Sequence, residues 1–296
     1  MESSPRQKHT VAIVVDSATS LPAEMNYDSQ LHIVPMTLTL DGKTYLDGQD
    51  ITPTSFYRML KDSPVPPTTS APSPASYLES FKQAAEKDQS ILCLTVGSGF
   101  SSSFDSANTA ARQALEVLPG VEISVLDSQS AAGGEGLIAL QALRAARKGD
   151  SLDEVRAVAE DVIPRIRLLA FLDTLYYLWK GGRVPRIAHT GTSIFRIKPL
   201  FELKQGEVST IARPRTHRRA VKRLLELMRE RAQSGPVHAT VMHADALEAA
   251  EELRNKVEAE FPCEDLFVSE FTPVMGAHIG PGLLGIAFWS NDRPAP

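Results

Sequence analysis

The chain has 296 residues, of which 43% are apolar and 23% charged, and its net charge is −5. This length suits two packed domains, and the composition is that of an ordinary globular protein. The negative charge gives no overall attraction to nucleic acid, and we expect no nucleic-acid partner.

The start of the chain and its cysteines predict a cytoplasmic protein. The first ten residues are polar, and the apolar run from Val11 to Val15 is too short for a secretory signal. No apolar run approaches the roughly 18 residues of a membrane-spanning helix. Cys93 and Cys263 are far apart, so a reducing compartment is expected, and Cys93 lies in the apolar run I-L-C-L-T-V as a buried side chain.

The first half of the chain alternates predicted strands and helices. This alternation is typical of a parallel sheet with helices on both faces. A D-G pair at Asp41-Gly42 adds a hairpin. The predicted strands are 11–15, 91–96 and 121–126, the hairpin is 38–46, and the helices are 77–87, 103–117 and 134–147.

Polar residues directly follow three of these strands: Asp16-Ser17, Gly97-Ser98 and Asp127-Ser128. Ligands of open α/β sheets bind beyond the carboxyl ends of the strands. We therefore expect hydroxyl groups gathered at this edge to meet a small polar group.

A capping box at Ser151 and Glu154 begins another helix, which Pro164 is expected to end. We place a domain boundary there, between an N-terminal parallel-sheet α/β domain (1–164) and a C-terminal α+β domain (165–296). The second domain is expected to hold an antiparallel sheet. Its predicted strands are 168–172, 197–203, 208–212, 237–243, 266–271 and 285–289, and its helices are 216–233 and 246–260.

Three further stretches stand out, and the first two each allow two interpretations. The serine loop S-G-F-S-S-S-F (98–104) either binds an anion at a helix N-terminus or only caps the helix. The stretch M-G-A-H-I-G-P-G (275–282) either uses His278 as a donor or base, or is a glycine turn with an exposed histidine. The stretch D-T-L-Y-Y-L-W-K-G-G-R (173–183) suits a buried helix with a glycine C-cap and basic residues at its end.

The basic stretch 212–231 holds eight Arg or Lys residues and two Glu residues. It is interpreted as a solvated helix face, as a docking face for an acidic protein, or as a nucleic-acid patch that lacks stacking aromatics. No metal is expected, because His238 and His243 would point to opposite faces of a strand and no cysteine cluster exists. No G-x-S-x-G nucleophile elbow is present.

Together these stretches resemble the DegV family of bacterial proteins over nearly the whole chain. The resembling motifs, in chain order, are V-A-I-V-V-D-S-A-T-S-L-P, V-P-M-T-L-T-L-D-G-K-T-Y-L-D-G, T-T-S-A-P-S-P, S-G-F-S-S-S-F-D-S-A, V-L-D-S-Q-S-A-A-G-G-E-G, L-Y-Y-L-W-K-G-G-R and G-A-H-I-G-P-G. The resemblance implies a long-chain fatty acid held between two α/β domains.

Several members of that family are the lipid-binding subunit of a bacterial fatty acid kinase. The resemblance then implies a protein that is no enzyme alone. A separate kinase subunit would use ATP and Mg²⁺ to convert the bound acid into an acyl phosphate for phospholipid synthesis. Transient contact with a membrane is compatible with this role, and no covalently bound cofactor is expected.

The resemblance also assigns residues. It implies carboxylate binding by Thr69, Ser70, Ser101, Ser102 and His278, and work with the kinase by Arg183. The candidates for the acyl tunnel are Phe171, Leu175, Ile194, Phe195 and Leu200.

The serine loop departs from the family pattern. The family usually has L-S-G-T-Y where this chain has F-S-S-S-F, so Ser102 replaces a glycine and Ser103 a threonine, and Ser101 aligns with the family serine. The prolines of T-T-S-A-P-S-P (68–74) limit the freedom of the unfolded chain, which lowers the entropy cost of holding Thr69 and Ser70 in place.

Two other functions compete with this one. The first is a serine hydrolase of a lipid-like ester, with a serine of loop 98–103 as nucleophile and His278 as base. The second is regulatory nucleic-acid binding through the basic stretch 212–231.

Overall fold

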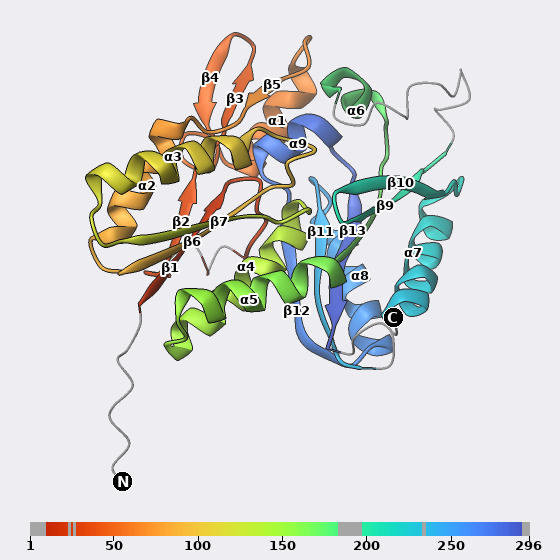
Figure 1. Ribbon diagram of the computed structural model, residues 1–296. Helices are drawn as coiled ribbons and strands as arrows, with labels where there is room; N and C mark the ends of the chain where they lie inside the picture. Colours follow the sequence, from red (N-terminus) through yellow and green to blue (C-terminus); the bar gives the residue numbers. More distant parts are fainter. Residues whose placement is uncertain (1–9, 23–24, 26–27, 183–196, 233–234, 292–296) are drawn as a thin grey trace.

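The computed structural model describes residues 10–22, 25, 28–182, 197–232 and 235–291 (Figure 1). Its first half is built on a four-stranded parallel sheet with the order β2-β1-β6-β7. Its strands are β1 (Val11–Asp16), β2 (Leu31–Val34), β6 (Ser90–Thr95) and β7 (Glu122–Asp127). Every residue of β1 is buried, as its unbroken apolar run predicts for a strand covered on both faces.

Two pairs of helices cover this sheet. One face carries α2 (Pro74–Ala85) and α3 (Ser103–Val117). The other carries α4 (Ala132–Lys148) and α5 (Leu152–Val162). The predicted capping box of Ser151 and Glu154 is present at the start of α5, and the short 3₁₀ turn Ile163–Arg165 follows α5. The predicted strand–helix alternation is confirmed.

A small antiparallel sheet, in the order β4-β3-β5, stands beside the parallel one (Figure 1). The predicted hairpin joins β3 (Thr37–Leu40) to β4 (Lys43–Leu46) through Asp41 and Gly42, both with positive φ. Its third strand, β5 (Thr68–Ser70), and the helix α1 (Pro53–Asp62) were not predicted. The stretch T-T-S-A-P-S-P therefore begins as a strand, and Thr69 is fixed by pairing with Leu38.

The second half is built on a six-stranded sheet with the order β10-β9-β8-β13-β11-β12. The prediction of an antiparallel sheet is wrong at one edge, where β11 and β12 run parallel. The reason is that α8 (Leu247–Glu260) is a crossover helix between the two strands. It returns the chain to the end of the sheet at which β11 begins, so β12 starts there too. The strands are β8 (Arg167–Phe171), β9 (Leu200–Lys204), β10 (Glu207–Ala212), β11 (Val237–His243), β12 (Cys263–Glu270) and β13 (Leu284–Ser290).

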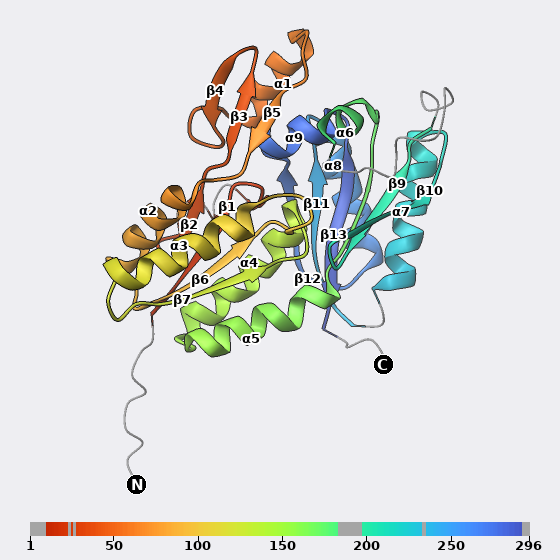
Figure 2. The ribbon, with the colours of Figure 1, turned by 45° about the horizontal axis from the view of Figure 1, so that its top comes forward.

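Helix α4 lies between the two large sheets (Figure 2). It packs on β1 and β6 with one side and on β8, β11 and β13 with the other. Its glycines permit this approach: a Cβ at Gly133 would lie 2.5 Å from Cγ2 of Thr240, and one at Gly136 would lie 2.8 Å from the carbonyl oxygen of Ser20. One hydrophobic cluster consequently runs through both halves. We retain the domain boundary near Pro164 as a proposal.

The opposite face of the six-stranded sheet is covered by α8 and by α7 (His217–Arg231), which holds most of the basic stretch. Several of its arginines are held in ion pairs, including Arg223 with Glu226 and Glu230 and Arg231 with Glu202. For the residues of the basic stretch that lie in α7, the interpretation as a solvated helix face is supported, and several of its arginines form ion pairs there.

Two short helices pack against each other above the sheets, α6 (Tyr176–Gly181) and α9 (Pro273–Ile279). The expected glycine C-cap of α6 is Gly182, with φ of +65°. The expectation that this helix is buried is wrong for two side chains, since Tyr176 is 43% and Trp179 60% exposed. The stretch around His278 is likewise a helix rather than a glycine turn.

Candidate functional site

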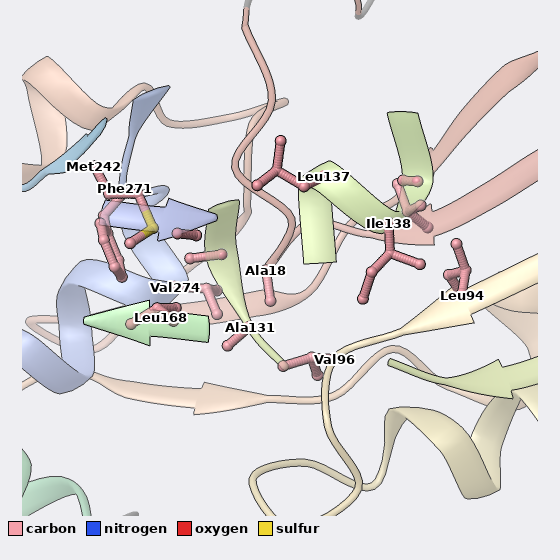
Figure 3. Close-up of a cluster of buried hydrophobic side chains, with 14 of the residues drawn as sticks. Ala18, Leu94, Val96, Ala131, Leu137, Ile138, Leu168, Met242, Phe271 and Val274 are labelled. Carbon is pink, nitrogen blue, oxygen red and sulfur yellow. The ribbon is translucent and has the colours of Figure 1, made fainter. Parts of the chain in front are cut away.

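A cavity lies between the carboxyl ends of the parallel strands and the inner face of the six-stranded sheet. It has a volume of about 1040 Å³ when its open side is included. Ala18, Val96 and Ala131 follow β1, β6 and β7, while Leu168 comes from β8 and Val274 from α9; Figure 3 shows how these side chains lie. The walls are therefore built from both halves of the chain.

The lining of this cavity is almost entirely apolar. Its polar side chains, within the described residues, are Thr69, Ser101 and His278. A cavity of this kind suits a ligand with a long hydrocarbon part and one polar group.

Thr69 and His278 are joined directly. The Thr69 Oγ1 and the His278 Nε2 are 2.7 Å apart. The contact links β5 of the small sheet to α9, so the pairing of β5 with β3 positions the imidazole.

The other side of the imidazole ring is set by α6. A Cβ added to Gly181 would lie 2.7 Å from the Nδ1 of His278, so the glycine allows the ring to sit against the end of α6. Gly280, with φ of +70°, then ends α9 directly after the histidine turn. Gly181 thus leaves room for the imidazole ring, and Gly280 ends the helix that carries it.

Ser101 is held by the start of α3. Its Oγ lies 2.9 Å from the Oγ of Ser103 and accepts a hydrogen bond of 3.2 Å from the Ser103 amide. The loop before it is fixed by Asp127, which accepts hydrogen bonds from the Ser98 hydroxyl and the Ser98 amide. The polar strand ends therefore mainly brace the loops, and Ser101 is the serine of this loop that reaches the cavity.

Beneath Ser103 lies a fully buried carboxyl group, that of Asp16. Its oxygens accept hydrogen bonds from the amides of Ala18 and Val96 and from the hydroxyl of Tyr77. Burial raises the pKa of Asp16 to about 6, although these hydrogen bonds offset part of the effect.

The predicted carboxylate ligands are only partly brought together. Thr69, Ser101 and His278 line one cavity, but Ser70 and Ser102 are exposed and do not line it. Ser102 has φ of −83°, a conformation that any residue adopts, so its replacement of a family glycine causes no backbone strain.

The predicted tunnel residues need correction. Phe171 and Leu200 belong to the hydrophobic cluster on the outer face of the six-stranded sheet, and Leu175 is buried outside the cavity lining. Because side chains alternate along a strand, Leu168, Ala170 and Leu172 line the cavity instead, joined by Phe201 and Leu203 of β9. Arg183, Ile194 and Phe195 lie outside the described residues.

The hydrolase interpretation gains no support from this geometry. The Nε2 of His278 contacts Thr69, and the Oγ of Ser101 contacts Ser103. Across the described ranges, no group of three or more His, Cys, Asp or Glu side chains is arranged to hold a metal ion. In the same residues, no helix combines the length and apolarity that crossing a membrane requires.

A second crevice, of about 1920 Å³ with its open side included, is lined by both polar and apolar residues, among them Ser17 after β1 and Asp245 after β11. Among its lining residues is Asp47, which is 2% exposed and accepts a 2.7 Å hydrogen bond from the hydroxyl of Ser17. Burial raises the pKa of Asp47 to about 6. This crevice differs from the apolar cavity in having several ionisable side chains around it.

Comparison with known proteins gives consistent matches over almost the whole chain. The family model described as "Uncharacterised protein, DegV family" matches residues 10–291. A DegV domain-containing protein of Streptomyces coelicolor is 34% identical over 284 residues, which are 95% of this chain and 99% of that protein.

Solved structures agree with the sequence matches. A DegV family protein from Thermus thermophilus, described for its fatty acid binding, has a TM-score of 0.87 at 29% identity and covers 95% of this chain and 99% of its own. A stearic-acid-binding protein from Eubacterium ventriosum has a TM-score of 0.86 at 26% identity, with 95% and 98% covered.

Proposed function

The chain belongs to the DegV family, and on this premise we propose that it binds a long-chain fatty acid in the apolar cavity. The observation that carries the proposal is the chemistry of the lining, in which Thr69, Ser101 and His278 are the polar groups of an otherwise apolar wall. Two structural relatives are described as binding fatty acids, which supports the same ligand class.

The hydrocarbon tail supplies most of the binding free energy in this proposal. Fourteen methylene groups of a sixteen-carbon acid, at ~0.8 kcal/mol each, contribute roughly 11 kcal/mol on leaving water. Association costs of about 4–15 kcal/mol cancel much of this. Hydrogen bonds from Thr69, Ser101 and His278 to the carboxylate add to the affinity and fix which end of the acid lies at the polar groups.

Co-purification tests this proposal directly. The protein is purified without added lipid, denatured, extracted and analysed by mass spectrometry, and the stripped protein is titrated with palmitate and oleate. We expect a bound long-chain acid and saturable binding. A lipid-free protein that binds neither acid contradicts the proposal.

We further propose that the protein presents the carboxylate to a separate kinase, which phosphorylates it with ATP to an acyl phosphate. The support is the family resemblance of the K-G-G-R stretch that ends at Arg183. Arg183→Ala is then expected to retain fatty-acid binding and to lower kinase-dependent acyl-phosphate formation. Equal loss of both activities contradicts this division of roles.

The hydrolase alternative has its own test. A fluorophosphonate probe that labels the protein, with labelling abolished in Ser101→Ala, would favour a serine nucleophile. We expect no labelling, because the imidazole Nε2 contacts Thr69 and not a serine of the 98–103 loop.

A further inference from the structure

A group of exposed arginines lies at the start of α7, and we call it the arginine patch. Its members are Arg213, Arg215, Arg218 and Arg219. Among the residues that the structure describes, no carboxylate forms an ion pair with any of the four side chains. Farther along α7, by contrast, Arg223, Arg229 and Arg231 each pair with a glutamate. The basic stretch thus has an ion-paired part and a part whose positive charge faces solvent alone.

Arginine is an unfavourable choice at two positions of the patch. Thr216 is the N-cap of α7, and its hydroxyl accepts a 3.3 Å hydrogen bond from the amide of Arg219. Arg218 and Arg219 therefore stand in the first helical turn, where the positive end of the helix dipole repels cations. A glutamate at position 219 could complete a capping box with Thr216. Because the chain keeps positive charge where an acid would stabilise the helix, the charge itself points to a use.

The arginine patch lies at the end of the six-stranded sheet that also carries α6. The strand registers place Phe171 of β8, Leu200 of β9 and Ala212 of β10 side by side, so the chain leaves β8 and β10 at the same end. After β8 the chain enters α6, whose Gly181 lies against the imidazole of His278. After β10 it enters the patch.

Lys198 ties these two exits together. Its amide donates a 2.7 Å hydrogen bond to the carbonyl oxygen of Pro214, which stands between two arginines of the patch. Its ammonium group lies 2.7 Å from a carboxylate oxygen of Asp173, next to the cavity-lining Leu172. A protein that approached α6 and the polar end of the cavity would therefore meet the arginine patch on the same side.

An acidic protein surface fits this patch better than a nucleic acid or a membrane does. Arginine binds carboxylates through two parallel hydrogen bonds and is enriched at protein interfaces. The stretch 212–231 has no Phe, Trp or Tyr on which a base could stack. Between residues 197 and 232, all of them described, no large apolar side chain is exposed, as insertion into a membrane surface would require.

We propose that the arginine patch is the docking surface for an acidic face of the kinase subunit that phosphorylates the bound fatty acid. The inference rests on the kinase partner of the proposed function. The cap at Thr216 and the contact of Pro214 hold the backbone of the patch in place before docking, which lowers its entropy cost. Exposed charges of this kind act on encounter and partner choice, so the patch should affect KM for the loaded protein more than kcat.

Charge reversal at the helix start tests this docking surface. The variant is Arg218→Glu/Arg219→Glu, in which both glutamates suit the helix N-terminus, so its urea unfolding midpoint should not fall below that of the wild type. The matched control is Lys82→Glu/Lys87→Glu, which changes the net charge equally at exposed residues in and just after α2. The oleate Kd should be the same in all three proteins.

The readout is acyl-phosphate formation by the kinase subunit of the same organism, at increasing concentrations of oleate-loaded protein. We expect KM for the loaded protein to rise about tenfold or more in the arginine variant, with kcat within about twofold of the wild type. KM of the lysine control should stay within about twofold. Raising NaCl from about 50 to about 300 mM should raise the wild-type KM and shrink the difference from the arginine variant.

The outcomes separate this proposal from the one on which it rests. Equal KM values in the wild type and the arginine variant overturn the docking surface and leave fatty-acid binding and kinase presentation intact. A wild type that binds oleate but is not phosphorylated overturns kinase presentation and the docking surface together. Anionic phospholipid vesicles and a DNA duplex are the competing occupants. If either binds the wild type but not the arginine variant, and KM is equal in both, the patch belongs to that occupant instead.

Discussion

Thr69 and His278 are 209 residues apart in the chain, and their side chains meet at 2.7 Å on the wall of an apolar cavity. The threonine is held by the small antiparallel sheet, and the histidine by a helix of the second half. The polar end of the site is thus assembled by tertiary structure.

This contact predicts coupling between the two residues. Thr69→Val keeps the shape of the side chain but removes the hydroxyl that contacts the imidazole. We expect Thr69→Val and His278→Ala each to weaken palmitate binding about tenfold or more. The double variant should lose less than the sum of the two, which a double-mutant cycle measures. Strict additivity would show that the contact contributes nothing to binding.

Adjacent serines offer a matched comparison. Ser101→Ala removes a donor to the carboxylate and is expected to cost about 1.5–3 kcal/mol of binding free energy, roughly 10- to 150-fold in Kd. Ser102→Ala should change Kd little, because Ser102 is exposed and outside the cavity. Titration with a fluorescent fatty acid measures both, and a larger loss at Ser102 would refute the site geometry.

Gly181 is predicted to be required for the position of the His278 imidazole, because a side chain at residue 181 would collide with the ring. Gly181→Ala places a methyl group 2.7 Å from the Nδ1 of His278 and should displace the ring, which weakens fatty-acid binding. The control is the same change in the His278→Ala background, where no ring remains to be displaced and Kd should not change further. A continued loss there would mean that the methyl group disturbs something other than His278.

The alternation along β8 predicts a change in chain-length preference. Ala170 lines the cavity, so Ala170→Leu fills part of it and should reduce stearate binding more than laurate binding. Phe171→Leu, on the opposite face of the strand beside His217, should lower the unfolding free energy by about 1 kcal/mol and leave the preference unchanged. Competition between the two acids measures the preference; an equal shift in both variants would contradict the assignment of faces.

The raised pKa of the buried Asp47 is predicted to make the stability of the fold depend on pH. Its pKa is raised to about 6 in the folded protein from an ordinary 3.8, so the unfolded chain ionises first as the pH rises. Ionisation of this group therefore lowers the unfolding free energy by about 2 kcal/mol between pH 4 and pH 6, and by about 3 kcal/mol over its whole titration. Urea unfolding at pH 4 and 7 should show a smaller decrease in Asp47→Asn than in the wild type. An unchanged decrease would mean that Asp47 is not the responsible group.

Local patterns were enough to predict most of the elements. The apolar runs at β1, β6 and β11, the capping box of α5 and the D-G turn after β3 are signals that lie within a few residues. The three-residue strand β5 and the proline-started helix α9 were missed, because both depend on distant partners. The parallel pairing of β12 was also missed, since it depends on the route of the chain after α8.

For the site, the structure places three of the five predicted polar residues on the cavity wall, but not Ser70 and Ser102, and it places none of the described apolar candidates there. Thr69, Ser101 and His278 were selected by motif, and all three line the cavity. Phe171 and Leu200 were selected as large apolar residues, although a continuous apolar strand does not reveal which of its faces looks inward. The predictions at Arg183, Ile194 and Phe195 stay predictions.

The position of α4 has a consequence for any attempt to divide the protein. A fragment ending at Pro164 would keep this helix but leave the side that packs on β11 and β13 bare to water, with the glycine-flattened surface at Gly133 lacking its partner Thr240. A fragment that begins at Pro164 would lack α4, so the face of the six-stranded sheet on which α4 packs would be exposed to water. The two halves should therefore aggregate when expressed separately, and should recover solubility only when they are produced together.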